Sequence, residues 1–260
     1  MSSTHALNIR EVGNGPPLVL LHAFPLSSEM WLPQSSALSS SWHLLLPDSP
    51  GFGASPNANG WTVDSHADEL ADALDAHGVT EPIVLGGLSM GGYVALAFAR
   101  RHPDRLRGLI LADTKAEADT DEAKANRDRM MAFAQDRGVA AVIDSMLPKM
   151  VSETTTKTRP EIVAEIRRIA SAQSVAGIVA ALQALRDRPD ATPHLGRITV
   201  PTQIIVGSDD ALTPPSAAHA LAAAIPNATV AEIPQSGHLS NLEASDKFNA
   251  ILRTFLANLK

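Results

Sequence analysis

Cysteine is absent from the 260-residue sequence. Disulfide bonds, a thiolate nucleophile and a metal site with cysteine ligands are therefore excluded. Positive charge is also scarce, since 21 lysines and arginines stand against 28 aspartates and glutamates and leave a net charge of -7. Proteins that bind nucleic acid usually carry a basic stripe, and the sequence has none, so we expect no nucleic-acid partner.

The sequence also lacks a long uninterrupted apolar run. The first ten residues, MSSTHALNIR, have no apolar segment of the kind found in signal peptides, which favours a cytoplasmic protein. Residues 82–99 carry no charge, and their length is close to the minimum for a membrane span, but four glycines and a proline interrupt them. We therefore expect no contact with a membrane. Internal repeats and low-complexity tracts are missing as well.

Hydrophobic residues, in contrast, are plentiful. They make up 45% of the chain, which is enough for a sizeable buried core. A length of 260 residues suits one large α/β domain, or such a domain with an insertion.

One serine stands at the apex of a sharp turn. In residues 83–97, IVLGGLSMGGYVALA, a short apolar run leads to Gly87, Ser89 and Gly91, and a helix-like apolar run follows. The pattern G-x-S-x-G between a strand and a helix is typical of a nucleophile elbow, in which a strained backbone exposes the serine hydroxyl. Both glycines are needed because a Cβ atom there would collide with the strand or the helix. The alternative is a buried helix with a glycine-rich start.

Short apolar runs alternate with helical patterns along the chain. Strands are predicted within 6–12 and at 18–21, 44–46, 83–85, 109–112, 203–206 and 229–233, and helices after Thr62, from Met90, over 214–225 and at the carboxyl terminus. Thr62 is a typical helix cap and Gly78 a typical helix stop. This alternation predicts a doubly wound, mostly parallel α/β sheet with helices on both faces.

Residues 115–190 show helical patterns and no strand pattern. The segment is too long for one crossover between strands. We therefore interpret it as a helical cap inserted into a core domain made of residues 1–114 and 191–260; the alternative is that these helices only add packing. Pro160 is expected at the first position of one of them.

Polar residues follow several of the predicted strands. Because the carboxyl ends of parallel strands meet at one edge of a sheet, Ser89, Asp210 and His238 are expected to lie together. A serine hydroxyl needs a base to accept its proton, and imidazole suits neutral pH. The imidazole in turn needs a carboxylate that fixes its tautomer. We predict a catalytic triad of these three residues, with Asp209 and Asp113 as alternatives for the acid.

The attacked carbonyl would become an oxyanion, which requires preorganised hydrogen-bond donors. The backbone N–H of Met90, directly after Ser89, and that of Phe24, after the strand at 18–21, are the predicted donors. We expect His22 to hold its own loop through hydrogen bonds rather than to take part in the chemistry. No metal ion and no cofactor are needed for this chemistry.

With these segments assembled, the sequence resembles the α/β-hydrolase family over nearly its whole length. The resemblance rests on HAFP at 22–25, DSPGFG at 48–53, GLSMGG at 87–92, GSDD at 207–210, TP at 213–214 and SGH at 236–238. It implies an eight-stranded, mostly parallel sheet with a helical cap, and hydrolysis through Ser89, His238 and Asp210 without a cofactor. SGHLSNLE at 236–243 and LADT at 111–114 resemble the branch of 3-oxoadipate enol-lactonases and small carboxylesterases. Relatives usually have glycine where this sequence has Ala23.

We therefore expect a serine hydrolase that cleaves small to medium carboxylic esters through an acyl-enzyme, as a monomer or small homo-oligomer. Lactone hydrolysis of the enol-lactonase type is an alternative, for which Arg127, Arg129, Arg167 and Arg168 are candidate partners of a substrate carboxylate. Perhydrolysis with hydrogen peroxide is another, and a non-enzymatic ligand sensor on the same fold is a third. The cap also contains several large apolar residues. They could line an adaptable apolar pocket or form the core of the cap itself, and they are Met130, Met131, Phe133, Met146 and Met150.

Overall fold

A computed structural model describes residues 7–57 and 59–259. Its centre is a seven-stranded sheet in the order β1-β3-β2-β4-β5-β6-β7. The strands are β1 (Ile9–Val12), β2 (Pro17–Leu21), β3 (His43–Pro47), β4 (Ile83–Leu88), β5 (Leu106–Ala112), β6 (Thr202–Gly207) and β7 (Ala228–Ile233). Among the described strands, only β1 pairs antiparallel with its neighbour, and β2 to β7 pair in parallel. The predicted mostly parallel sheet is confirmed, with seven strands in the described residues where the family resemblance implies eight.

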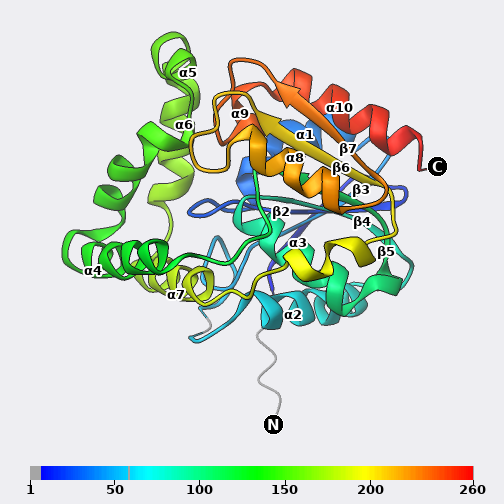
Figure 1. The fold of residues 1–260 in the computed structure, drawn as a ribbon, viewed down its shortest axis with the longest axis horizontal. Coiled ribbons are helices and arrows are strands. Elements are labelled where there is room, and N and C mark those ends of the chain that lie inside the picture. The colour runs from blue at the N-terminus through cyan, green and yellow to red at the C-terminus, as the bar shows by residue number, and fades with distance from the viewer. Residues whose placement is uncertain (1–6, 58, 260) are drawn as a thin grey trace.

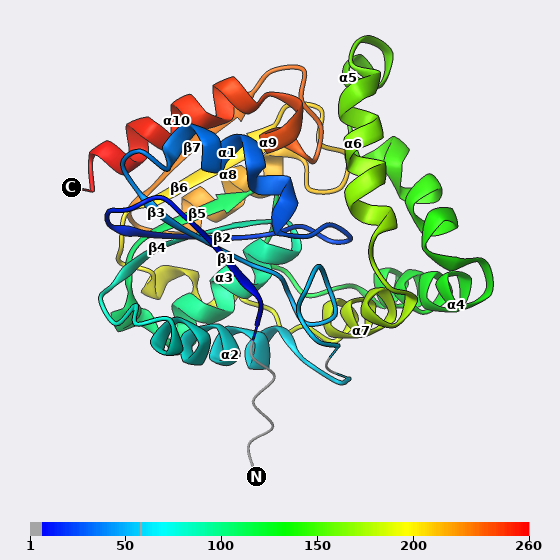
Figure 2. The ribbon, with the colours of Figure 1, turned by 180° about the vertical axis from the view of Figure 1, so that it is seen from behind.

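Helices cover both faces of this sheet (Figures 1 and 2). The helices are α1 (Leu32–Leu38), α2 (Val63–Ala76), α3 (Met90–Arg101), α8 (Pro215–Ala224), α9 (Ser240–Glu243) and α10 (Ser245–Ala257). Thr62 caps α2 by accepting a hydrogen bond from the backbone N–H of Ser65, as its sequence predicts. Pairs α2 and α3, and α1 and α10, pack against each other on opposite faces.

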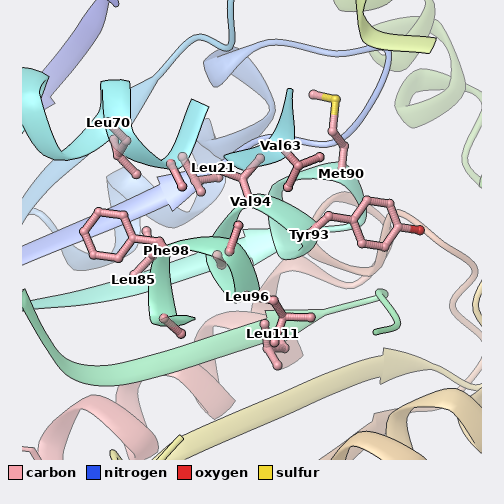
Figure 3. Packing of buried hydrophobic residues seen from close by; sticks show 14 of the residues in the cluster. Leu21, Val63, Leu70, Leu85, Met90, Tyr93, Val94, Leu96, Phe98 and Leu111 are labelled. Atoms are coloured by element: carbon pink, nitrogen blue, oxygen red, sulfur yellow. The ribbon is translucent and has the colours of Figure 1, made fainter. Parts of the chain in front are cut away.

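Two hydrophobic clusters form the core, one on each face of the sheet. Successive strand residues alternate between them, so that Ile204 and Val206 belong to one cluster and Ile205 to the other. Figure 3 shows the first cluster, in which side chains of α2 and α3 meet those of the central strands. This packing holds the central strands rigid, and the carboxyl ends of those strands carry the candidate site.

Four further helices lie between β5 and β6 in the chain. They are α4 (Asp121–Met150), α5 (Glu153–Thr158), α6 (Pro160–Ser171) and α7 (Val175–Arg186), and they group together at one end of the sheet (Figures 1 and 2). Pro160 is the first residue of α6, as predicted. Helix α4 is sharply kinked at Gly138, whose backbone is not helical (φ 77°, ψ 177°). The kink folds α4 into two arms, a shape that its sequence pattern does not predict.

Within the described residues, no single helix has both the length and the hydropathy of a membrane span. Only α6 and α7 taken together meet that criterion, and the two are bent by 95° at the break between them.

Candidate active site

Ser89 occupies the turn between β4 and α3. Its backbone conformation (φ 55°, ψ -111°) is one that residues other than glycine rarely adopt. The turn is so tight that a Cβ on Gly87 would lie 2.1 Å from the carbonyl oxygen of Gly91. A Cβ on Gly91 would lie 2.3 Å from the carbonyl oxygen of Leu21. The glycines therefore permit the turn, and Ser89 remains partly exposed at its apex.

His238 and Asp210 form a buried pair after the neighbouring strands β7 and β6. The distance between Nδ1 of His238 and Oδ2 of Asp210 is 2.8 Å, and the residues are 2% and 3% exposed. Because Nδ1 donates to the carboxylate, Nε2 is left as the nitrogen that can accept a proton.

The carboxylate of Asp210 is held by more than the histidine. Its oxygens also accept hydrogen bonds from the backbone N–H groups of Leu212 and Thr213, and from the hydroxyl of Thr213 at 2.7 Å. Burial alone would raise the pKa of Asp210, but the hydrogen bond and charge of His238 and the bonds from Thr213 keep that pKa below its usual value. Asp210 is therefore ionised at neutral pH. The role of Thr213 is absent from the sequence analysis, although the residue is part of a motif identified there.

The other two candidate acids have different surroundings. Asp209 is exposed, and its carboxylate accepts a hydrogen bond only from the hydroxyl of its neighbour Ser208 among the described residues. Asp113 is fully buried, where it accepts hydrogen bonds from the N–H of Gly207 at 2.8 Å and from the hydroxyl of Ser240. Burial and the nearby charge of Asp210 raise the pKa of Asp113 well above its usual value. Within the described part of the chain, neither carboxylate hydrogen-bonds His238.

The hydroxyl of Ser89 makes no hydrogen bond to His238 within the described part of the chain. The structure thus joins two members of the predicted triad directly. It places the third, Ser89, at the end of β4 in the same sheet. In the strand order, β5 and β6 lie between β4 and β7.

The two predicted oxyanion donors have no acceptor in the part of the chain that the structure describes. The backbone N–H groups of Phe24 and Met90 bond no described residue, and Met90 is the first residue of α3, where no intrahelical acceptor exists. Ala23 is not among the described residues with positive φ, so its backbone conformation does not require glycine. The N–H of Ala23 instead contacts Sδ of Met30 at 3.1 Å.

His22 connects two loops, as its sequence position suggests. Its Nε2 accepts the backbone N–H of Ser49 at 2.9 Å, and its Nδ1 lies 3.0 Å from the carbonyl of Ala23. Burial lowers the pKa of His22, which favours the neutral form that these contacts need.

Glu243 is a buried carboxylate that the sequence analysis does not identify. It is 0% exposed, and its two oxygens accept the N–H of Gly237 at 2.9 Å and the N–H of Ser152 at 2.8 Å. Gly237 precedes His238, and Ser152 lies between α4 and α5. Glu243 therefore ties the His238 loop to the inserted helices. Glu243 is the last residue of SGHLSNLE at 236–243, and that stretch is the sequence signal for this role.

A cavity of about 280 Å³ lies between Phe24, Leu212 and the inserted helices α4 and α7. Of the candidate pocket residues, Met130 and Met146 line it, whereas Met131 and Met150 are buried and Phe133 is 38% exposed. No cluster of three or more potential metal ligands occurs in residues 7–57 and 59–259.

Comparison with known proteins agrees with this architecture. A model of the alpha/beta hydrolase fold family matches residues 16–245. The chain is 30% identical to a pimeloyl-[acyl-carrier protein] methyl ester esterase of Chromobacterium violaceum, over 93% of this chain and 94% of the relative.

Two solved structures are also similar. A thermophilic esterase from Thermogutta terrifontis, solved with malate bound, superposes with a TM-score of 0.95 at 38% identity, covering 97% of this chain and 93% of that one. The enol-lactonase from Burkholderia xenovorans LB400 superposes with a TM-score of 0.90 at 29% identity, covering 96% of each chain.

Proposed function

Since the chain belongs to the alpha/beta hydrolase fold family, we propose that it is a serine hydrolase that cleaves carboxylic esters of small to medium size. Ser89 is the nucleophile, His238 the general base and acid, and Asp210 the residue that orients the imidazole. The backbone N–H groups of Phe24 and Met90 hold the oxyanion. No cofactor takes part.

The observation that carries this proposal is the buried contact between His238 and Asp210, at the sheet edge where the strained turn presents Ser89. An imidazole that donates Nδ1–H to an ionised carboxylate has its second nitrogen available for a serine proton. The missing bond between Ser89 and His238 is compatible with this role because such bonds are often long before substrate binds.

The reaction proceeds in two halves. The Ser89 hydroxyl attacks the ester carbonyl and passes its proton to Nε2 of His238, which gives it to the departing alcohol and leaves an acyl-enzyme. Water then attacks the acyl group, loses a proton to the same nitrogen, and the carboxylic acid leaves as the proton returns to Ser89. In both halves the unpaired N–H groups of Phe24 and Met90 stabilise the negative oxygen, and one such donor is typically worth about a hundred- to a thousandfold in rate.

We further propose that residues 115–190 act as a cap on a core domain of residues 1–114 and 191–260. The cavity between α4, α7 and Phe24 supports this division because it opens between the inserted helices and the strand ends. Its side chains would then set the size of the substrate.

Lactone hydrolysis is a second candidate activity. It is favoured by the similarity to the enol-lactonase over nearly the whole chain. The chemistry would be the same, since a lactone is a cyclic ester whose alcohol stays attached to the acyl group.

A serine-directed phosphonate probe, combined with a panel of p-nitrophenyl esters, lactones and a peracid assay, tests the proposal. We expect labelling and ester hydrolysis by the wild type, and neither by Ser89→Ala. His238→Ala is expected to fall to a similar residual rate because triad members act as a unit. Half of the wild-type rate in either variant would contradict the assignment. An unlabelled wild type that still binds esters would instead favour a ligand sensor.

A further inference from the structure

The cavity beside the candidate site is built mainly by the two arms of α4. Ala123, Asn126, Arg127 and Met130 line it from the first arm at spacings of three and four residues, which places them on one helix face. Ser145, Met146 and Lys149 line it from the second arm in the same way. The kink at Gly138 makes this arrangement possible because it divides one long helix into two arms with different directions.

The remaining walls come from outside α4. Phe24 and Leu212 contribute from the loops after β2 and β6, and Leu182 contributes from α7. Phe24 provides a proposed oxyanion donor, and Leu212 donates its N–H to the carboxylate of Asp210. Ser89 and His238 do not line the cavity, so Phe24 and Leu212 are the residues that connect it to the proposed chemistry.

The charged residues of the cavity are all of one sign. Arg127 and Lys149 line it, and no aspartate or glutamate does. The whole chain has a net charge of -7, so a general excess of cations does not explain this concentration of positive charge.

Arg127 is held in place by a buried ion-pair cluster. Its Nε donates to Asp119 at 2.9 Å, and the same carboxylate accepts a bond from the buried Arg188 at 2.7 Å. Burial alone would raise the pKa of Asp119, but the two guanidinium groups keep it low, so the carboxylate stays ionised. One carboxylate thus faces two guanidinium groups, which leaves one positive charge. Nη1 and Nη2 of Arg127 bond no described residue and remain free for a ligand.

Lys149 has no ion-pair or hydrogen-bond partner among the residues that the structure describes. Two arginines on α6 differ from it. Arg167 pairs with Asp144, and Arg168 pairs with Glu165 and Glu29. Of the four arginines considered for a substrate carboxylate, only Arg127 lines the cavity.

We propose that Arg127 and Lys149 select substrates whose acyl part ends in a carboxylate, so that the enzyme prefers the half-ester of an aliphatic dicarboxylic acid over a neutral ester. This specificity rests on the proposed ester hydrolysis. The free terminal nitrogens of Arg127 suit a carboxylate because a guanidinium can donate two parallel hydrogen bonds. The apolar walls bind the methylene chain between the two ends. The cavity of about 280 Å³ gives room for such a chain.

Three methyl esters of equal chain length test the proposal: monomethyl adipate, methyl hexanoate and the methyl ester of ε-aminocaproic acid. They carry a negative charge, no charge and a positive charge at the distal end. We expect kcat/KM, followed by acid release, to be highest for monomethyl adipate, by about tenfold over methyl hexanoate, as for a hydrogen bond to a charged group. The preference should shrink on adding salt, because about 0.1 M salt limits exposed charge interactions to ~10 Å.

Variants then assign the effect. Lys149→Gln is expected to lower kcat/KM for monomethyl adipate about tenfold more than for methyl hexanoate, and Lys149→Glu to reverse the order of the charged esters. Arg127→Gln should act in the same direction. If this substitution disturbs the ion-pair cluster, the Lys149 variants still test the proposal, because Lys149 is exposed and its substitution leaves the fold intact. Lys157→Gln, an exposed cation on α5 outside the cavity, is the matched control. Equal rates for the three esters would overturn this specificity alone. Failure to hydrolyse any ester would overturn the proposed function.

Discussion

Asp210 and Asp113 are buried carboxyl groups at neighbouring strand ends, yet their surroundings shift their pKa values in opposite directions. The bonds from His238 and Thr213 lower the pKa of Asp210, whereas burial and the charge of Asp210 raise that of Asp113. Two close carboxylates in a site of low dielectric cannot both be ionised cheaply. The arrangement therefore favours one ionised acid and one neutral acid.

Substitution of each acid by asparagine should separate their roles. Asp210→Asn is expected to reduce kcat by about 10⁴-fold, because an amide no longer fixes the imidazole tautomer. Asp113→Asn should keep most of its activity, since the amide still accepts the N–H of Gly207 and can donate to Ser240. Asp209→Asn is the exposed control. Steady-state kinetics of the three variants on one ester measure the loss of kcat. A large loss in Asp113→Asn together with an active Asp210→Asn would assign the acid of the triad to Asp113 instead of Asp210.

At the scale of elements, the loop that carries His238 is attached to the inserted helices. Besides the bonds to Glu243, the N–H of Leu239 donates to the carbonyl of Met150 at 3.1 Å, and the hydroxyl of Ser152 donates to the carbonyl of Gln235. A Cβ on Gly237 would lie 2.6 Å from the nitrogen of Ser152. The position of the imidazole is therefore set partly by residues outside the sheet.

Removal of Glu243 should loosen both elements together. Glu243→Ala leaves two buried N–H groups without acceptors, at about 1–3 kcal/mol each in free energy of unfolding. We expect lower stability in urea unfolding and a fall in kcat, with a smaller loss in Glu243→Gln, which keeps one acceptor oxygen. Glu153→Ala, at an exposed position on α5, is the control. If Glu243→Ala lost stability but retained its kcat, Glu243 would have no positioning role for His238.

Element type follows closely from the sequence, whereas element ends and bends do not. The predicted strand at 83–85 continues to Leu88 because Gly86 and Gly87 stay in the ladder with Ile110 and Leu111 of β5. Glycine weakens the strand signal, and pairing on both sides outweighs it. The kink at Gly138 is similar, because a single glycine in a helical pattern does not reveal whether the helix bends there.

On the scale of the whole molecule, pairing across long sequence distances decides what the sequence leaves open. The sequence pattern predicts that His238 and Asp210 lie close together, because both residues follow strands of one parallel sheet. The bond from Ser152 to Glu243 spans 91 residues, and that from Gly207 to Asp113 spans 94. The first contact depends on how the inserted helices pack on the sheet, and the second depends on the pairing of β5 with β6. The preference for Asp210 over Asp113 and Asp209 likewise rests on its contact with His238, since Asp113 is just as buried, and a single sequence does not give that contact.

Two buried histidines join the sheet to α2 and the loop at 48–53. Nε2 of His66 lies 3.1 Å from the hydroxyl of Ser49, whose N–H donates to His22. Both histidines are 0% exposed. Burial, and then the charge of His22, lowers the pKa of His66 from 6.5 to about 3. His66 is therefore neutral in the folded protein at every pH at which the enzyme would work.

Acid should consequently destabilise the fold through His66. The unfolded chain takes up this proton below pH 6.5 while the folded chain resists it until about pH 3, so the stabilisation is complete above pH 6.5 and is lost as the pH falls towards 3. At ~1.4 kcal/mol per pH unit, the loss reaches about 2 kcal/mol by pH 5. Asp113, whose pKa is raised, acts in the opposite direction.

A difference between two variants isolates His66 from the other groups. His66→Gln should be less stable than the wild type near neutral pH, because it packs less well and changes the bond to Ser49, but its free energy of unfolding should fall less steeply with acid. The difference in free energy of unfolding between the wild type and His66→Gln, measured by urea unfolding at successive pH values, should shrink by about 2 kcal/mol between pH 7.5 and pH 5. His219→Gln, an exposed histidine on α8, should keep the wild-type slope. A constant gap would mean that the folded protein protonates His66 as readily as the unfolded chain does, and that this histidine is not what limits the fold in acid.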